Sequence, residues 1–132
     1  MKLSEAIVLG STQINFDPFV FLFINENGFN REPAPCGCLL GMAMYADGER
    51  QDGAISFHYR WPWLFRQFPV PEIVGEIYHD RNMASAEAII STMAFKVKAE
   101  TITFEQALQW IRDNEPQEEV PVSITETEAV AV

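Results

Sequence analysis

The sequence predicts a mainly α-helical fold, a compact bundle of about five short helices. The alternative is an α+β arrangement that includes one β-hairpin near residues 19–31. Two observations support this fold class. Residues 38–46 are apolar on nearly every face, as in a helix that is buried all round. Residues 85–113 contain two helical patterns, each of which begins at a hydroxyl residue. The chain has 132 residues, 48% of them hydrophobic, which is enough for one domain with its own core.

Residues 3–10 (LSEAIVLG) are expected to form the first helix. Ser4 is a good N-cap, Glu5 suits the positive end of the helix dipole, and Gly10 suits a left-handed stop. A helix of about two turns is not stable alone, so we expect packing to hold it in place.

A β-hairpin is expected next. Residues 19–25 (FVFLFIN) are rich in aromatic and β-branched side chains, which favour a strand. The Asn27-Gly28 pair is a strong hairpin signal, and residues 29–31 would form a short partner strand. The Pro-Ala-Pro sequence at residues 33–35 then ends regular structure.

The middle of the chain is expected to hold the buried helix 38–46 and segments punctuated by proline. Residues 54–61 alternate loosely between apolar and polar, so they fit either a strand or the start of a helix. Residues 62–65 (PWLF) place a proline in the first turn of a helix. Residues 71–79 are expected to form a further helix that also begins at a proline.

The last third carries the strongest helical signals. Ser85 is expected to cap a helix over residues 86–98. Thr103 is expected to cap a helix over residues 104–113, and Thr103 and Gln106 have the spacing of a capping box. The apolar residues of this last helix recur at the period of one helix face: Phe104, Ala107, Leu108 and Ile111.

The domain is expected to span residues 1–115, followed by a flexible acidic tail over residues 116–132. The net charge is −10, and residues 113–132 hold six acidic residues and no Lys or Arg. Taking these six from the 19 acidic residues leaves 13, against 9 basic residues, in residues 1–112. No basic stripe is present, so we expect no direct binding to a nucleic-acid phosphate backbone. An acidic nucleic-acid mimic is one alternative for a chain of this charge.

The apolar segments give an expectation for cellular location. The longest uncharged apolar runs, residues 19–24, 36–46 and 88–95, are far shorter than the roughly 20 residues of a membrane span. Residues 1–10 do not show the apolar stretch and cleavage site of a secretory signal. We therefore expect a cytoplasmic protein with no membrane association.

Cys36 and Cys38 are candidate reactive thiols. Cysteines this close in sequence do not easily form an unstrained disulfide, and a cytosolic chain keeps them reduced. If Gly37 is an N-cap, Cys38 lies in the first turn of a helix, where the helix dipole lowers a thiol pKa. His58 or His79 would then be the base. The alternative is an unreactive thiol packed against the apolar helix.

Zinc is the one cofactor that the sequence suggests. Two cysteines and two histidines are the right number for a tetrahedral site: Cys36, Cys38, His58 and His79. Paired zinc ligands are usually about two to five residues apart, whereas the two histidines are 21 apart. Glycine-rich phosphate loops are absent and no carboxylates pair at catalytic spacing, so we predict no catalytic residues and no other cofactor.

The aromatic segment 61–68 is the best candidate for contact with a protein partner or a second copy of the chain. Trp61, Trp63, Phe65 and Arg66 are the expected contact residues, because Trp and Arg are frequent interface anchors. The alternative is that both tryptophans belong to the core. Trp110 lies off the apolar face of the last helix and is expected to be half exposed.

The chain resembles a group of short uncharacterised bacterial and phage proteins. The resemblance rests on four motifs in the same order: MKLSEAI-x-LG at residues 1–10, Cys38-Leu39-Leu40-Gly41-Met42-Ala43, Trp61-Pro62-Trp63-Leu64, and the final helix capped by Thr103. The group has no settled activity, so the resemblance implies none. Many members have a second cysteine pair and a further histidine where this chain has residues 67–71 and Ser91. The resemblance implies that any metal site of those members is missing here.

The function predicted from the sequence is that of a small accessory or interaction protein without catalytic activity. The first alternative is a metal-binding or thiol-dependent protein centred on Cys36 and Cys38, with an exposed thiol or bound zinc. The second alternative is the acidic nucleic-acid mimic, which requires acidic residues arrayed on the folded domain.

Overall fold

The computed structural model describes residues 1–24, 34–50, 57–75 and 82–117. In these ranges the fold is mainly α-helical, which confirms the predicted class. The described helices are α1 (Leu3–Ser11), α2 (Leu39–Ala46), α3 (Phe57–Arg60), the 3₁₀ helix η1 (Pro62–Phe65), α4 (Ala86–Lys98) and α5 (Phe104–Asn114). Within the same ranges, none of the helices has the length and apolar character needed to cross a lipid bilayer.

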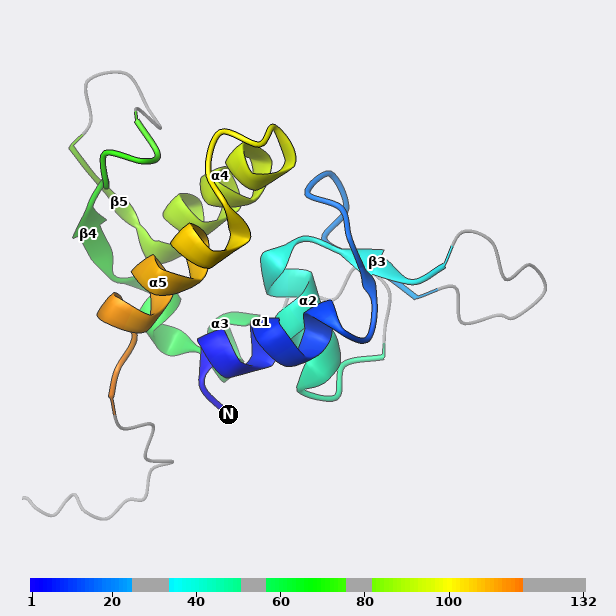
Figure 1. The fold of residues 1–132 in the computed structure, drawn as a ribbon. Helices are drawn as coiled ribbons and strands as arrows, with labels where there is room; N and C mark the ends of the chain where they lie inside the picture. Colours follow the sequence, from blue (N-terminus) through cyan, green and yellow to red (C-terminus); the bar gives the residue numbers. More distant parts are fainter. Residues whose placement is uncertain (25–33, 51–56, 76–81, 118–132) are drawn as a thin grey trace, which may run out of the picture.

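Helix α1 packs against α2 near the centre of the molecule (Figure 1). The predicted helix over residues 3–10 is present and extends one residue further, from Leu3 to Ser11, but the predicted N-cap at Ser4 and stop at Gly10 were wrong. The N-cap is Lys2, whose backbone N–H donates to Glu5 Oε1 at 3.2 Å. Gly10 does not end the helix, and it lies directly against the main chain of Met42 in α2. Its missing side chain therefore allows the close contact between the two helices.

Helix α2 is buried, as its apolar sequence predicted. Its residues Leu39, Leu40, Met42 and Met44 are each at most 2% exposed. Cys38 is the N-cap of this helix, so the sulfur precedes the first turn rather than lying within it. A buried helix with no polar face must be fixed by packing alone.

A small sheet lies beside α2 and joins strands β1 (Asn15–Phe16), β3 (Cys36–Gly37) and β2 (Leu22–Phe23) in that order. Strand β3 pairs in parallel with β1 and antiparallel with β2. The predicted first hairpin strand is therefore present over two of its residues. The predicted partner, residues 29–31, lies outside the described residues, and the strand that pairs with β2 is β3.

Residues 57–75 follow the predictions only in part. Residues 57–60 are helical, which decides between the strand and helix alternatives for this part of the segment 54–61. The proline at the start of η1 occupies the first turn, as expected, although the helix is 3₁₀. The predicted helix over residues 71–79 is wrong for residues 71–75, which form a turn closed by Val74 N–H donating to Pro71 O at 2.9 Å. Val74 is the one buried residue of these five, so little packing would hold a helix there.

Strands β4 (Gln67–Pro69) and β5 (Met83–Ser85) form a second, antiparallel sheet that the sequence did not predict. The two small sheets lie at opposite ends of the molecule, with the helices between them (Figure 1). The backbone groups of β4 and β5 that face each other are satisfied by this pairing, which brings the chain back to the start of α4.

The caps of α4 and α5 are confirmed. Ser85 Oγ accepts from the backbone N–H of Ala88 at 3.1 Å. Thr103 Oγ1 accepts from Gln106 N–H at 3.0 Å, and Gln106 Oε1 accepts from Thr103 N–H at 2.8 Å, which is the predicted capping box. Trp110 is half-buried, as expected.

The N-terminal and C-terminal helices are joined by a buried carboxylate. Glu115 is only 5% exposed, and it accepts from the Ser4 backbone N–H at 3.1 Å and from Ser4 Oγ. Ser4, the predicted N-cap of α1, therefore binds the residue that follows α5 instead. The described part of the chain ends two residues later, so the predicted acidic tail lies outside it from residue 118 on.

Candidate functional site

Four rings form a continuous row that begins at the surface and reaches the core, and we call Phe65, His58, Phe57 and Phe21 the aromatic row. Phe65 stacks on His58 with ring centroids 3.9 Å apart and planes 16° apart. His58 lies 4.2 Å from the Phe57 ring, which lies 5.2 Å from the Phe21 ring. The row is anchored at Phe57, which is 7% exposed, and ends at Phe65, which is 63% exposed.

His58 also faces a carboxylate of α4. Its Nε2 lies 3.7 Å from Glu87 Oε1, and this nitrogen is buried with no hydrogen-bond partner among the described residues. The two side chains are 26% and 39% exposed. The single turn of α3 supplies both the imidazole of His58 and Phe57, the buried ring of the row.

Cys38 lies on the same side of the molecule, close enough to Glu87 for the two groups to interact electrostatically. Burial raises the pKa of the Cys38 thiol, and the Glu87 carboxylate raises it further. The nearby N–H groups of Gly41 and Leu40 act in the opposite direction, although no capping hydrogen bond to the sulfur forms. The sulfur donates to Phe21 O at 3.8 Å. The net effect of these surroundings is to keep the thiol protonated.

Cys36 has different surroundings. It is half-buried in strand β3, and burial together with the Asp17 carboxylate raises the pKa of its thiol. Both cysteines are free. Neither thiol therefore has the electropositive setting that activates a nucleophile, and the proposed lowering of the Cys38 pKa by the helix is outweighed by burial.

Three of the four predicted zinc ligands, Cys36, Cys38 and His58, lie within the described residues. In residues 1–24, 34–50, 57–75 and 82–117, no group of three or more His, Cys, Asp or Glu side chains is arranged to hold a metal ion. His79 lies outside these ranges. The four-residue site of Cys36, Cys38, His58 and His79 thus stays a prediction.

The expected partner-binding residues separate into two pairs. Trp61 and Trp63 are 1% and 5% exposed, so the indoles belong to the core and do not form a contact surface. Trp61 Nε1 donates to Met1 O at 3.1 Å, which fixes the N-terminus of the chain to η1. Phe65 and Arg66 are exposed, so the contact surface predicted for segment 61–68 is reduced to these two side chains.

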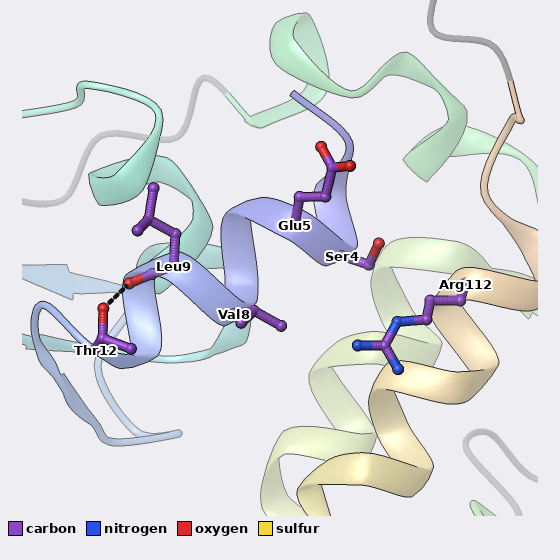
Figure 2. A pocket seen from close by; sticks show the side chains of 6 residues that line it. All are labelled: Ser4, Glu5, Val8, Leu9, Thr12 and Arg112. Atoms are coloured by element: carbon purple, nitrogen blue, oxygen red, sulfur yellow. Dashed lines mark hydrogen bonds between the residues drawn. The ribbon is translucent and has the colours of Figure 1, made fainter.

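A hollow with a volume of about 430 Å³ lies between α1 and α5. Figure 2 shows Val8 of α1 facing Arg112 of α5 across this groove. Val8 and Leu9 are each 40% exposed, and Arg112 Nη1 lies 2.8 Å from Glu105 Oε2. None of the residues singled out by sequence as catalytic, metal-binding or partner-binding lines this groove.

Another hollow, of about 290 Å³, lies between α5 and the turn that follows β4. We call it the Trp110 hollow after its largest side chain. The remaining lining residues are Pro71, Glu72, Ile73, Gln106, Gln109 and Asp113.

Sequence reasoning missed Glu87 as a site residue and missed both hollows. Glu87 has the position of an ordinary first-turn acid of α4, and only the fold brings it to His58. For the Trp110 hollow a partial signal existed, since Trp110 was expected to lie off the buried face of its helix. Comparison with protein-family models, with curated proteins and with solved structures finds no match to this chain.

Proposed function

We propose that the protein is a non-catalytic accessory protein that binds a protein partner through Phe65 and Arg66, at the exposed end of the aromatic row. The partner contributes an apolar side chain, which packs on the free face of Phe65, and a carboxylate, which pairs with Arg66. This proposal narrows the contact surface expected for segment 61–68 to the two side chains that are accessible.

The observation that carries the proposal is the state of Phe65. Its ring is 63% exposed, yet one face is stacked on His58 at 3.9 Å. A ring held in this way has already lost much of its side-chain freedom, so a partner that packs on it meets a smaller entropic cost. Large exposed aromatic side chains next to an arginine are also typical of the anchors of protein interfaces.

Arg66 supplies the positive charge that pairs with the partner's carboxylate. Its guanidinium carbon lies 5.8 Å from the centre of the Phe68 ring, and no carboxylate of the described residues lies within ion-pair distance of it. The other arginine of this region, Arg60, is bound to Asp47 at 2.6 Å and to Glu49 at 2.9 Å. Arg66 is therefore the cation of the two that can accept a partner's carboxylate.

The surroundings of the thiols support a role without catalysis. Burial and neighbouring carboxylates raise the pKa of both cysteines, so little thiolate is present at neutral pH. A thiol-dependent reaction at Cys38 would require the opposite shift or a base in contact with the sulfur.

A photo-crosslinking experiment tests the proposal on the full chain in the cells that produce it. A photoreactive phenylalanine analogue replaces Phe65, and a second chain carries it at Tyr59, which is 88% exposed, as the position control. We expect one discrete protein adduct at position 65 that is absent at position 59 and is lost on Arg66→Glu. An adduct of twice the chain mass would identify the partner as a second copy.

Two outcomes of this experiment would contradict the proposal. No adduct at position 65, or an adduct whose yield is the same with Arg66→Glu, would rule out the proposed surface. Arg66→Glu is expected to change the free energy of unfolding by no more than about 0.5 kcal/mol, because the side chain is exposed. Urea unfolding of the purified variant checks that loss of the adduct is not loss of the fold.

A further inference from the structure

The outward face of α5 carries polar side chains around one large ring. Gln106, Gln109, Trp110 and Asp113 are spaced at i, i+3, i+4 and i+7, so they lie on one face of the helix. The turn that begins at Pro71 lies across from this face and closes the Trp110 hollow. The hollow thus brings an indole together with polar side chains from two separate elements.

Trp110 is held firmly by other rings. Its ring centroid lies 5.5 Å from that of Phe68, at an interplanar angle of 76°, and 6.5 Å from that of Trp63. Phe68 and Trp63 also contact each other edge to face at 5.8 Å. This cluster fixes the orientation of the indole, which is half-buried on the side of the rings and open toward the hollow.

The described charged side chains of the hollow are negative. Among the described residues, its charged lining side chains are Glu72 and Asp113, and no described Lys or Arg lines it. Gln109 Nε2 donates to Asp113 Oδ1 at 2.8 Å, which positions that carboxylate. Among the described residues, neither carboxylate takes part in an ion pair. Two carboxylates that line the same hollow as Trp110 therefore have no cation among the described residues to balance them.

We propose that the Trp110 hollow binds an arginine side chain of a protein partner. A guanidinium group stacks on the face of tryptophan by cation–π attraction and pairs with carboxylates through its planar fork of N–H donors. Glu72 and Asp113 provide the carboxylates, one from each side of the hollow. The chemistry of the lining selects a cation, and the flat indole selects the planar guanidinium over the compact ammonium of lysine.

This inference goes beyond the proposed function and does not depend on it. Phe65 and Arg66 do not line the Trp110 hollow, and the arginine can be tested as a small molecule without any partner. Failure of the crosslinking experiment would therefore leave the arginine site standing, and the reverse also holds.

The test uses the full-length purified protein labelled with ¹⁵N and titrated with N-acetyl-arginine methylamide at low salt. The protein has three tryptophans, so Trp110→Phe assigns the Trp110 indole N–H resonance by its disappearance. We expect this resonance to shift in a saturable way with a dissociation constant in the millimolar range. N-acetyl-lysine methylamide is expected to bind more weakly, and the uncharged N-acetyl-glutamine methylamide is expected to cause no saturable shift.

Matched variants make the result specific. Glu72→Gln combined with Asp113→Asn is expected to weaken arginine binding about fivefold or more, because both charges are removed while the ring stays. Glu100→Gln combined with Glu105→Gln changes the net charge equally at exposed carboxylates outside the hollow, and it is expected to weaken binding less than twofold. The remaining amide resonances of each variant report whether the fold is intact.

Two outcomes would overturn the inference. The first is an equal shift with the glutamine probe, which would mean that the indole responds to the amide groups of any probe. The second is equal weakening by the two double variants, which would mean that only the overall negative charge attracts the arginine.

Discussion

Helices α2 and α5 are held in position in opposite ways. Helix α2 has no polar face, makes no side-chain cap at its N-terminus, and is buried from Leu39 to Met44. Helix α5 has a full capping box, a buried stripe that includes Leu108 and Ile111, and an exposed face opposite. One helix is positioned by the surrounding protein, and the other largely by its own sequence.

The difference teaches where a small domain can place a binding surface. Every face of α2 is in contact with protein, and at Gly41 the carbonyl of Phe21 occupies the place of a side chain. Helix α5 uses one face for the core and leaves the other free for the Trp110 hollow. In this chain the most hydrophobic helix, α2, therefore offers no binding surface, whereas the exposed face of α5 does.

Gly41→Ala is the change that would break α2 most severely. A Cβ at this position would overlap Phe21 O, and a main-chain neighbour cannot move as a flexible side chain can. We expect a loss of about 3 kcal/mol in the free energy of unfolding, at the upper end of the usual cost of overpacking. Urea unfolding followed by circular dichroism measures it. Ser11→Ala, at the exposed end of α1, serves as control and should change stability by at most about 0.5 kcal/mol. A loss below about 1 kcal/mol for Gly41→Ala would contradict the tight contact.

The burial of Cys38, the N-cap of α2, predicts that the stability of the protein depends on pH. Burial raises the pKa of Cys38 in the folded state, so the folded chain holds this proton more tightly than the unfolded chain does. Stability is then fully present below the unfolded thiol pKa of about 8.5 and falls as the pH rises above it, by at most about 1.4 kcal/mol per pH unit.

Unfolding midpoints between about pH 7.5 and pH 9.5 measure this slope. Cys38→Ala is expected to flatten it, and Cys36→Ala is expected to have the smaller effect because Cys36 is more exposed to solvent. If Cys38→Ala keeps the full slope, another group is responsible for the proton uptake.

Thr103→Ala tests the independence of α5 and has the smallest expected effect. The substitution removes the oxygen that accepts from Gln106 N–H, and loss of an N-cap oxygen destabilises by about 1 kcal/mol. We expect the cost to appear as faster hydrogen exchange in the first turn of α5 with little change in α2. An equal rise in exchange throughout α2 would show that the two helices do not open independently of each other.

The elements that the sequence predicted well are those defined by local chemistry. Ser85 and Thr103 begin α4 and α5 because a hydroxyl beside free N–H groups forms a cap from neighbouring residues alone. The burial of α2 followed from its composition for a similar reason. Ser4 has the same chemistry, but a long-range carboxylate binds it instead, so the predicted cap was wrong.

The features that sequence reasoning missed depend on contacts between distant residues. Strands of two or three residues, such as β3 and β5, carry no periodic signal, and their partners are set by the packing of the helices around them. The candidate site shows the same limit. Cys38 and His58 were named from their chemistry, but Glu87, the group near both, became visible only in the fold.

The bond between Ser4 and Glu115 has a consequence for a chain that is synthesised from its N-terminus. The two partners are 111 residues apart, so the hydroxyl of Ser4 stays without this acceptor until nearly the whole domain has left the ribosome. Closing a contact of such long sequence separation is slow and comes late in folding. The carboxylate of Glu115 is therefore the last group to bind α1, and a ribosome stalled before it would hold a nascent domain whose first helix can pack against α2 but lacks this bond.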